Sequence, residues 1–177
     1  ILDLGCGGGN NSSFFINEGH KVFAVDGSRK ALELTKKKCG YSSDLICLHN
    51  NFKNLDITSG HIDLVIDRQS IGHNSRDDIT KILTEVHRVL KYGGKVFSCM
   101  FSRKHGALIS DSYSGDDFFL KFDSGEFSKS GNVYFTDEND LRELFSKFII
   151  RDIRRISNVS CISHMSIEYF IIIAEKI

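Results

Sequence analysis

Four glycines and one acid lie close together at the start of the chain, in the stretch ILDLGCGGGNN. The stretch has the spacing acid-x-Gly-x-Gly-x-Gly, carried by Asp3, Gly5, Gly7 and Gly9. Glycine has no Cβ atom, so a backbone rich in glycine can approach a ligand closely. An ordinary turn from strand to helix needs only one or two glycines, so this stretch indicates a ligand-binding loop. An acid just before the loop suits a ligand with a positive group, such as an amine or a sulfonium, better than a pyrophosphate.

Two phosphate-binding motifs do not match this loop. A P-loop ends in Gly-Lys-Ser/Thr, which is absent here, and the dinucleotide motif GxGxxG requires a glycine where Asn10 stands. A second acid, Asp26, ends the next apolar run, KVFAVD. A carboxylate in that place can accept both hydroxyls of a ribose, as in dinucleotide-binding proteins. Asp26 could instead cap the next helix, although Ser28 already offers such a cap.

Seven short apolar runs predict β-strands, and helical patterns separate most of them. The runs span residues 1–4, 21–26, 44–48, 62–67, 95–101, 148–156 and 167–175. Strands that alternate with helices favour right-handed crossovers and a mainly parallel sheet. The last two runs are close enough in sequence to pair antiparallel. We therefore predict an α/β fold, Rossmann-like and doubly wound, with a mainly parallel seven-stranded sheet, an antiparallel last strand and helices on both faces.

Capping residues mark where the expected helices begin. Ser28 can cap the second helix, and Asp77 or Asp78 can cap a longer one. This longer helix has one apolar face, formed by Ile79, Ile82, Leu83, Val86 and Leu90. A last helix would begin at Thr136 or Asp137.

The 177 residues suit a single domain with a substantial core. We find no repeat and no linker, so we expect one domain over residues 1–177. Because the sequence starts without Met and inside a strand-like run, we expect this domain to lack an N-terminal segment here. Residues 103–135 interrupt the alternation of strands and helices with several glycines and aromatic residues. We interpret them as an insertion over the active site that includes a hairpin.

Composition and charge argue against several classes of function. Lys plus Arg and Asp plus Glu each number 23, and this zero net charge argues against a nucleic-acid partner. Five cysteines without a CxxC pair favour reduced thiols over a zinc site or disulfides, so we expect a cytoplasmic protein without a metal. The longest apolar run, YFIIIA, is too short to span a bilayer, so no membrane partner is expected.

The chain resembles the class I S-adenosylmethionine-dependent methyltransferases in four successive motifs. They are ILDLGCGGG, VFAVDGS, DLVIDRQSIGH and EVHRVLKYGGKVF. The first has the family's complete acid-x-Gly-x-Gly-x-Gly form, and the fourth contains RVLKPGG with Tyr92 in place of the proline. The resemblance covers nearly the whole chain and implies S-adenosyl-L-methionine as the cofactor.

The resemblance implies cofactor-binding roles for the loops that follow the first two strands. The glycine loop would line the methionine and ribose parts of the cofactor, and Asp3 would support this loop and favour the positive amino group. Asp26 would hold the ribose hydroxyls. With neighbouring and later residues included, the implied cofactor-binding set is Asp3, Gly5, Cys6, Gly7, Gly9, Asp26, Gly27, Ser28, Asn51, Phe52 and Asp67.

Residues after the third strand would face the adenine. Asn51, or the adjacent Asn50, stands where the family usually has an acid, and an amide oxygen can still accept a hydrogen bond from the adenine amine. Phe52 would pack on the adenine ring or remain an ordinary core residue. We interpret the Cys6 side chain as a small packing group and not as a nucleophile.

The fourth strand ends in IDRQSIGHN, where the family has groups that face the substrate. The Asn/Asp-Pro-Pro-aromatic motif of methyltransferases that modify amino groups of DNA bases is absent. Asp67 and Arg68 would line the sulfonium or the substrate. His73 is the candidate catalytic residue, because methylation of an oxygen requires a base and histidine titrates near neutral pH. The alternative for His73 is a structural or solvated role.

The sequence thus predicts an enzyme that transfers a methyl group from S-adenosylmethionine to an oxygen or nitrogen of a small-molecule acceptor. Two alternatives stay open. An NAD-dependent oxidoreductase or epimerase would use a similar sheet, although Asp3 and Asn10 argue against it. A non-catalytic binding module would keep the fold and the cofactor site without turnover. The sequence does not identify the acceptor or the oligomeric state.

Overall fold

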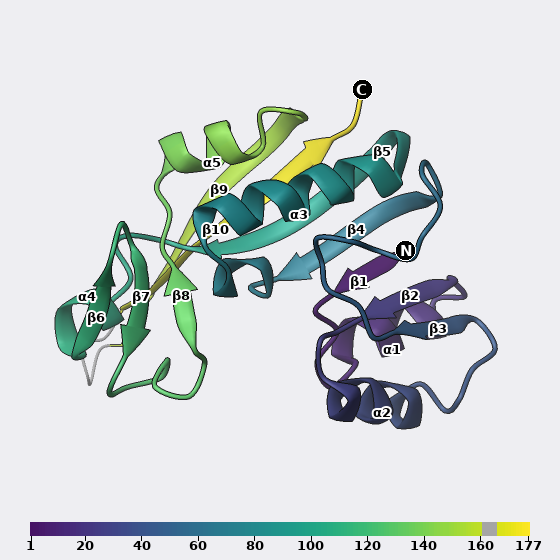
Figure 1. Ribbon diagram of the computed structural model, residues 1–177, viewed down its shortest axis with the longest axis horizontal. Helices are drawn as coiled ribbons and strands as arrows, with labels where there is room; N and C mark the ends of the chain where they lie inside the picture. The colour runs from purple at the N-terminus through teal and green to yellow at the C-terminus, as the bar shows by residue number, and fades with distance from the viewer. Residues whose placement is uncertain (161–165) are drawn as a thin grey trace.

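The computed structural model describes residues 1–160 and 166–177, which form a seven-stranded sheet and a separate three-stranded sheet (Figure 1). The large sheet has the strand order β3-β2-β1-β4-β5-β10-β9. Its strands are β1 (Leu2–Leu4), β2 (Val22–Val25), β3 (Leu45–Leu48), β4 (Ile62–Arg68), β5 (Leu90–Phe101), β9 (Ile149–Val159) and β10 (Ser166–Glu175). Only β10 runs against the direction of the other strands of this sheet, among the described residues. The predicted sheet is confirmed. Cys161, one of the five cysteines expected to be reduced, lies outside the described residues.

The strand order reverses beside β1. From β1 the chain moves outward to β2 and β3, and it then returns to pair β4 with the other side of β1. Ligands of open parallel sheets bind where the order reverses, beyond the carboxyl ends of the strands. The glycine loop leaves β1 at this place, so the fold brings it to the expected position of a ligand site.

Helices cover both faces of the large sheet (Figure 1). Their bounds are α1 (Asn10–Asn17), α2 (Arg29–Lys38), α3 (Arg76–Val89) and α5 (Glu138–Leu144). α3 and α5 pack on one face, and α1 and α2 pack on the other. None of the helices in the described part of the chain is long and apolar enough to cross a membrane.

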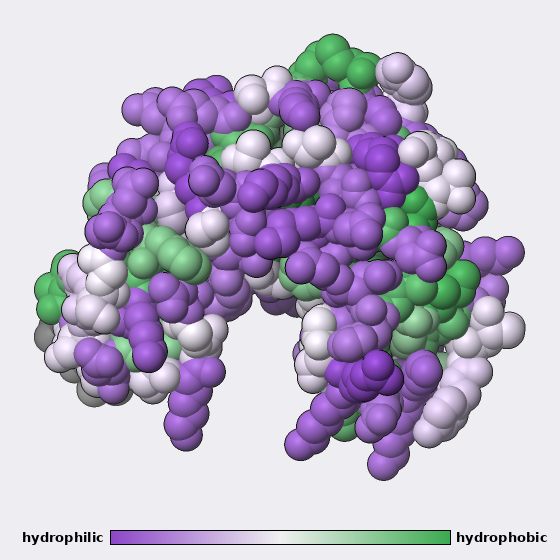
Figure 2. Space-filling model, viewed as in Figure 1, coloured by the Kyte–Doolittle hydropathy of each residue, from purple (hydrophilic) through white to green (hydrophobic). Residues whose placement is uncertain are grey.

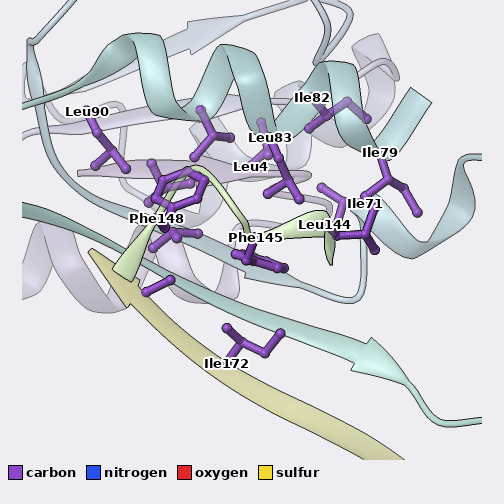
Figure 3. Packing of buried hydrophobic residues seen from close by; sticks show 14 of the residues in the cluster. Leu4, Ile71, Ile79, Ile82, Leu83, Leu90, Leu144, Phe145, Phe148 and Ile172 are labelled. Carbon is purple, nitrogen blue, oxygen red and sulfur yellow. The ribbon is translucent and has the colours of Figure 1, made fainter. Parts of the chain in front are cut away.

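The main hydrophobic core lies between the sheet and helices α3 and α5 (Figure 3). Both layers contribute to it, through residues such as Leu4, Ile79, Ile82, Phe145 and Ile172. The apolar face expected for α3 is confirmed and is buried in this core. On the opposite face, a smaller cluster joins Cys6 and Ala24 to Leu32 of α2. The sheet is therefore held from both sides close to the glycine loop.

Serine side chains cap α2 and α3. Ser28 accepts the N–H of Ala31 at the start of α2, as predicted. α3 is capped by Ser75, which accepts the N–H of Asp78, so the prediction of Asp77 or Asp78 as its cap is wrong. Both acids lie instead in the first turn, where negative charge is favourable to the helix dipole.

The connection between β3 and β4 contains no helix and is fixed to α3 by Arg88. The guanidinium donates to the carbonyl oxygens of Leu55 and Ile57 and forms an ion pair with Glu85. Glu85 also accepts the N–H of Leu55 at 2.7 Å. These contacts satisfy backbone groups that are not paired in a helix or a strand. They give the loop after β3, which carries the residues expected to face adenine, a defined position.

Residues 103–135 form the short helix α4 (Ala107–Ser110) and an antiparallel sheet of β6 (Tyr113–Asp116), β7 (Phe119–Phe122) and β8 (Asn132–Tyr134). β6 and β7 form a hairpin, and both residues of its turn, Asp117 and Phe118, have positive φ as a type I′ turn requires. Figure 2 shows the surface hollowed between this small sheet and the part of the molecule built by α1 and α2. The segment builds a second hydrophobic core against Phe101 of β5, made of Phe101, Ala107, Leu120, Phe122, Phe127, Val133 and Phe135.

Replacement of Ser75 by alanine should destabilise the protein, because the N–H of Asp78 loses its acceptor. We expect the free energy of unfolding to fall by about 1 kcal/mol, a typical cost of removing a serine cap. Urea denaturation measures this change, with Ser75→Asp as the matched control because its carboxylate restores an acceptor. Equal stability of Ser75→Ala and the wild type would show that another group caps α3.

Candidate functional site

The glycine loop after β1 has three glycines with positive φ: +78° at Gly5, +52° at Gly7 and +79° at Gly9. Two of them leave no room for a side chain. A Cβ atom on Gly5 would lie 2.2 Å from the Cβ of Ser70, and one on Gly9 would lie 2.8 Å from the Cα of Thr35. A Cβ atom on Gly7 would meet no atom within 4 Å. Gly5 and Gly9 are therefore needed for the packing of the loop itself, and the backbone at Gly7 is open to a ligand.

Asp3 lies in β1 beneath the loop and is only 1% exposed. Its carboxylate accepts the N–H and the hydroxyl of Ser12 at 3.0 and 2.6 Å, and the side-chain amide of Asn11 at 3.3 Å. Burial raises the pKa of this carboxyl, and the hydrogen bonds with Ser12 oppose that rise. Asp3 thereby joins the first turn of α1 to β1 and supports the loop from below.

Asp26 follows β2 and joins the glycine loop to the start of α2. One carboxylate oxygen accepts the N–H of Gly7 at 3.0 Å, and the other accepts the N–H of Ser28 at 2.8 Å. The residue is partly exposed, and each oxygen retains a second lone pair for a further donor. Beside it, Gly27 also borders open space. Asp26 thus holds the loop in place and still presents acceptors to a ligand.

A pocket of about 390 Å³ opens beside Gly27. It is lined by Gly27, His49, Asn50, Asn51, Phe52 and Asn74. The Nε2 atom of His49 lies 2.9 Å from the carbonyl oxygen of Gly27, which closes one wall. Phe52 is partly buried against the core. Asn51 and Phe52 therefore lie together at this pocket, whereas sequence reasoning did not identify His49 or Asn74.

Asp67 is the residue before the end of β4 and is 1% exposed. Its carboxylate accepts the N–H groups of Ser70 and Ile71 at 2.9 and 3.1 Å, the hydroxyl of Ser98 at 2.5 Å, and the hydroxyl of Ser70. These bonds hold the turn into the short 3-10 helix η1 (Ile71–His73). Burial raises the pKa of the Asp67 carboxyl despite these bonds. These contacts of the carboxylate are all internal, so Asp67 holds the turn and does not line the pocket beside Gly27.

The turn after β4 is locked to the glycine loop. Gln69 has a φ of +68°, a conformation that residues other than glycine seldom adopt. The next residue, Ser70, lies against Gly5, and its Oγ is 2.5 Å from the carbonyl oxygen of Leu4. Sequence reasoning did not identify Ser70, because a serine in a loop carries no signal of a contact 66 residues away.

Cys6 lies inside the loop and is 5% exposed. Burial raises the pKa of its thiol to about 12, and the nearby hydroxyl of Thr35 opposes this rise. The thiol is therefore protonated near neutral pH, which is the state of a packing group and not of a nucleophile.

A second pocket of about 490 Å³ lies between the turn after β4 and the small sheet. His73 borders it, and its Nδ1 atom lies 3.3 Å from the carbonyl oxygen of Asn132. A carbonyl oxygen only accepts, so in the neutral ring Nδ1 carries the proton and Nε2 keeps its lone pair. His73 is thus able to accept a proton through Nε2. Other lining residues include Ser70, Phe101, His105, Glu126 and Phe127.

Known sequences resemble this chain over much of its length. The family described as methyltransferase domain matches residues 1–94. A demethylmenaquinone methyltransferase of Lactococcus lactis is 31% identical over 166 residues, covering 83% of this chain and 64% of that protein. A malonyl-[acyl-carrier protein] O-methyltransferase of Hamiltonella defensa is 33% identical over 96 residues, covering 54% of this chain and 35% of that protein. The chain thus spans about a third to two thirds of the length of these relatives.

Solved structures share the fold. A SAM-dependent methyltransferase of Methanosarcina mazei has a TM-score of 0.78 at 21% identity, covering 100% of this chain and 92% of that one. A second structure is the 1,6-didemethyltoxoflavin-N1-methyltransferase of Burkholderia thailandensis with bound 1,6-didemethyltoxoflavin and S-adenosylhomocysteine. It has a TM-score of 0.74 at 20% identity, and the match covers 99% of this chain and 69% of that one. The [4+2]-cyclase SpnF has a TM-score of 0.73 at 18% identity, and the match covers 99% of this chain and 74% of that one. Likeness at these identities establishes the fold and not the reaction.

Alanine at Gly9 should destabilise the protein more than alanine at Gly7. Both variants strain a left-handed backbone, which costs about 1–2 kcal/mol. Only Gly9→Ala also forces a Cβ atom to within 2.8 Å of the Thr35 backbone. Urea denaturation should therefore show the larger loss of unfolding free energy for Gly9→Ala, and equal losses would contradict this packing of the loop.

Cys6 should resist alkylation in the folded protein, because the thiolate is the reactive form and the pKa of this thiol is raised to about 12. At pH 8, iodoacetamide followed by mass spectrometry should modify the partly exposed Cys47 much faster than Cys6. Unfolding in urea should remove this difference. Modification of Cys6 at the same rate in folded and unfolded protein would show that the thiol is accessible as a thiolate.

Proposed function

The chain belongs to the S-adenosylmethionine-dependent methyltransferases, and we propose that it transfers the methyl group of S-adenosylmethionine to an oxygen or nitrogen of a small-molecule acceptor. One observation carries this proposal. At the carboxyl ends of β1 and β2, the open backbone of Gly7 meets the partly exposed carboxylate of Asp26 beside a pocket. This combination suits a ligand that has a ribose and a positively charged tail.

The residues around this junction fit the cofactor. Asp26 has lone pairs left for the ribose hydroxyls, and the backbone at Gly7 has space for the methionine part. The pocket beside Gly27 would take the adenine. Phe52 would lie against the adenine ring, and Asn51 would accept a hydrogen bond from its amine.

Other residues of the predicted cofactor-binding set support the loops of the site. Their packing or hydrogen bonds hold the loops that would contact the cofactor. In this proposal they therefore shape the site without providing its main ligand contacts. They are Asp3, Gly5, Cys6, Gly9, Ser28 and Asp67.

Bound S-adenosylmethionine would supply a methyl group that is already activated by the sulfonium charge. The protein then has to align the acceptor, exclude water and remove a proton from the acceptor atom. His73 suits the last task, because Asn132 holds the proton on Nδ1 and leaves Nε2 free to act as a base. The contact between Ser70 and Gly5 supports this arrangement, since it brings the pocket of His73 next to the glycine loop.

Several observations support a small acceptor and a cytoplasmic setting. Relatives are named for demethylmenaquinone and for 1,6-didemethyltoxoflavin. The zero net charge argues against nucleic acid. The thiols of Cys6, Cys39, Cys47 and Cys99 are free, as is usual in a reducing compartment.

Asp26→Ala should weaken the binding of S-adenosylhomocysteine, because it removes the acceptors for the ribose and the anchor of the Gly7 N–H. Isothermal titration should show at least about a tenfold higher Kd, equivalent to about 1.4 kcal/mol. The exposed acid Asp44, changed to alanine, is the matched control and should bind like the wild type. Equal affinity of Asp26→Ala and the wild type would contradict the ribose contact, and binding of NAD instead would contradict the proposed cofactor site.

His73→Gln should reduce methyl transfer and leave the affinity for S-adenosylhomocysteine unchanged. The assay follows the labelling of acceptors in a metabolite extract with a radioactive methyl donor. The loss of a general base predicts a fall of about 100-fold or more. A wild-type protein that binds S-adenosylhomocysteine but labels no acceptor would favour a non-catalytic binding module, and full activity of His73→Gln would exclude His73 as the base.

A further inference from the structure

The pocket that contains His73 has a second polar end, formed by His105 and Glu126 of the 103–135 segment. The ring of Phe101 lies between the two histidines, with its centroid 6.3 Å from that of His73 and 5.8 Å from that of His105. Phe127 packs edge-on against Phe101 with the centroids 4.8 Å apart. The pocket therefore offers His73 near the glycine loop, an aromatic wall, and a carboxylate near the small sheet.

His105 is an N–H donor directed at this second end. The residue is 1% exposed, and its Nδ1 atom accepts the N–H of Ala107 at 3.2 Å. The proton of the neutral ring is therefore on Nε2. This Nε2 atom lies 3.0 Å from Oε1 of Glu126, so the buried ring holds the Glu126 carboxylate by a close contact, although the N–H is not aligned for a hydrogen bond. Burial lowers the pKa of His105, which keeps the ring neutral beside the carboxylate.

Glu126 lines this end of the pocket, and Asp111 lies close enough to act on the charge of Glu126. Within residues 1–160 and 166–177, neither Glu126 nor Asp111 forms an ion pair with Lys or Arg. Oδ2 of Asp111 is buried without a hydrogen bond, and burial together with Asp111 raises the pKa of Glu126. The guanidinium of Arg68, which also borders the pocket, is exposed and bonds to Asn11 of α1. The Glu126 side chain is 39% exposed, so a ligand in the pocket can reach its carboxylate, and a cation supplied by that ligand would pair with it.

We infer that this end of the pocket binds an ammonium group of the methyl acceptor, with Glu126 as the specificity-determining carboxylate and His105 as its positioning residue. The aromatic rings of Phe101 and Phe127 add an apolar surface that also attracts cations. An acceptor with a neutral or anionic group in this place would leave Glu126 and Asp111 without a counter-charge. The inference rests on the proposed function, because it takes the ligand of this pocket to be the methyl acceptor. The residues that carry it are separate from the glycine loop.

The test compares two probes in the presence of S-adenosylhomocysteine, 2-phenylethylamine and its neutral counterpart 2-phenylethanol. Binding is followed by the NMR chemical shifts of the protein. The wild type should bind the amine at least about tenfold more tightly than the alcohol, a difference of about 1.4 kcal/mol. Glu126→Gln keeps the shape of the side chain and should abolish this preference. Asp123→Asn removes an exposed charge just after β7 and should keep it.

His105 is tested by two variants of different chemistry. His105→Gln can present an amide N–H near the position of Nε2, so it should retain more of the preference for the amine than His105→Phe. A purely structural role for His105 would instead make the two variants lose affinity for both probes equally, and that result would exclude it as a positioning residue.

Three results would overturn the ammonium site: equal binding of the two probes to the wild type, no binding of the amine, or an unchanged preference in Glu126→Gln. The affinity for S-adenosylhomocysteine, measured on the same samples, separates this failure from a failure of the proposed function. Cofactor-product binding without a preference for the amine contradicts the ammonium site alone. A preference for the amine in a protein that does not bind S-adenosylhomocysteine supports the cation site and contradicts the methyltransferase proposal.

Discussion

The contact between Ser70 and Gly5 is the constraint on which the rest of the site depends. Ser70 occupies the space where a side chain on residue 5 would lie, and its hydroxyl oxygen is 2.5 Å from the carbonyl oxygen of Leu4. The loop after β1 and the turn after β4 are therefore packed together at the point where the strand order reverses. This junction supports the groups on both of its sides, because the loop donates the Gly7 N–H to Asp26 and the turn continues into η1, which contains His73.

Two carboxylates at strand ends hold this junction in different ways. Asp67 is buried, and its oxygens accept two backbone N–H groups and two serine hydroxyls, so it is used entirely by the turn. Asp26 is partly exposed and holds the N–H groups of Gly7 and Ser28 while it keeps lone pairs for a ligand. Two aspartates at similar positions thus have different roles: Asp67 gives internal support, and Asp26 contacts the ligand in our proposal.

The fold could be predicted to a large extent because its signals are local. Apolar runs marked the strands, and one apolar face marked α3, whereas the choice between Ser75 and the two acids after it depended on which oxygen reaches an N–H group. The site was harder to predict. The burial of Asp67 is decided in part by Ser98, which is distant in sequence, and Glu126 meets His105 inside an irregular, glycine-containing segment. No periodicity or spacing in the sequence predicts contacts of this kind.

The central claim is that the junction of the glycine loop with Asp26 binds the nucleoside of S-adenosylmethionine. A crystal structure of the protein with S-adenosylhomocysteine tests it most directly. Our account predicts the ribose hydroxyls within hydrogen-bonding distance of the Asp26 carboxylate, the amino-acid tail along the backbone at Gly7, and the adenine in the pocket beside Phe52. A nucleoside bound elsewhere, with Asp26 contacting only Gly7 and Ser28, would contradict it.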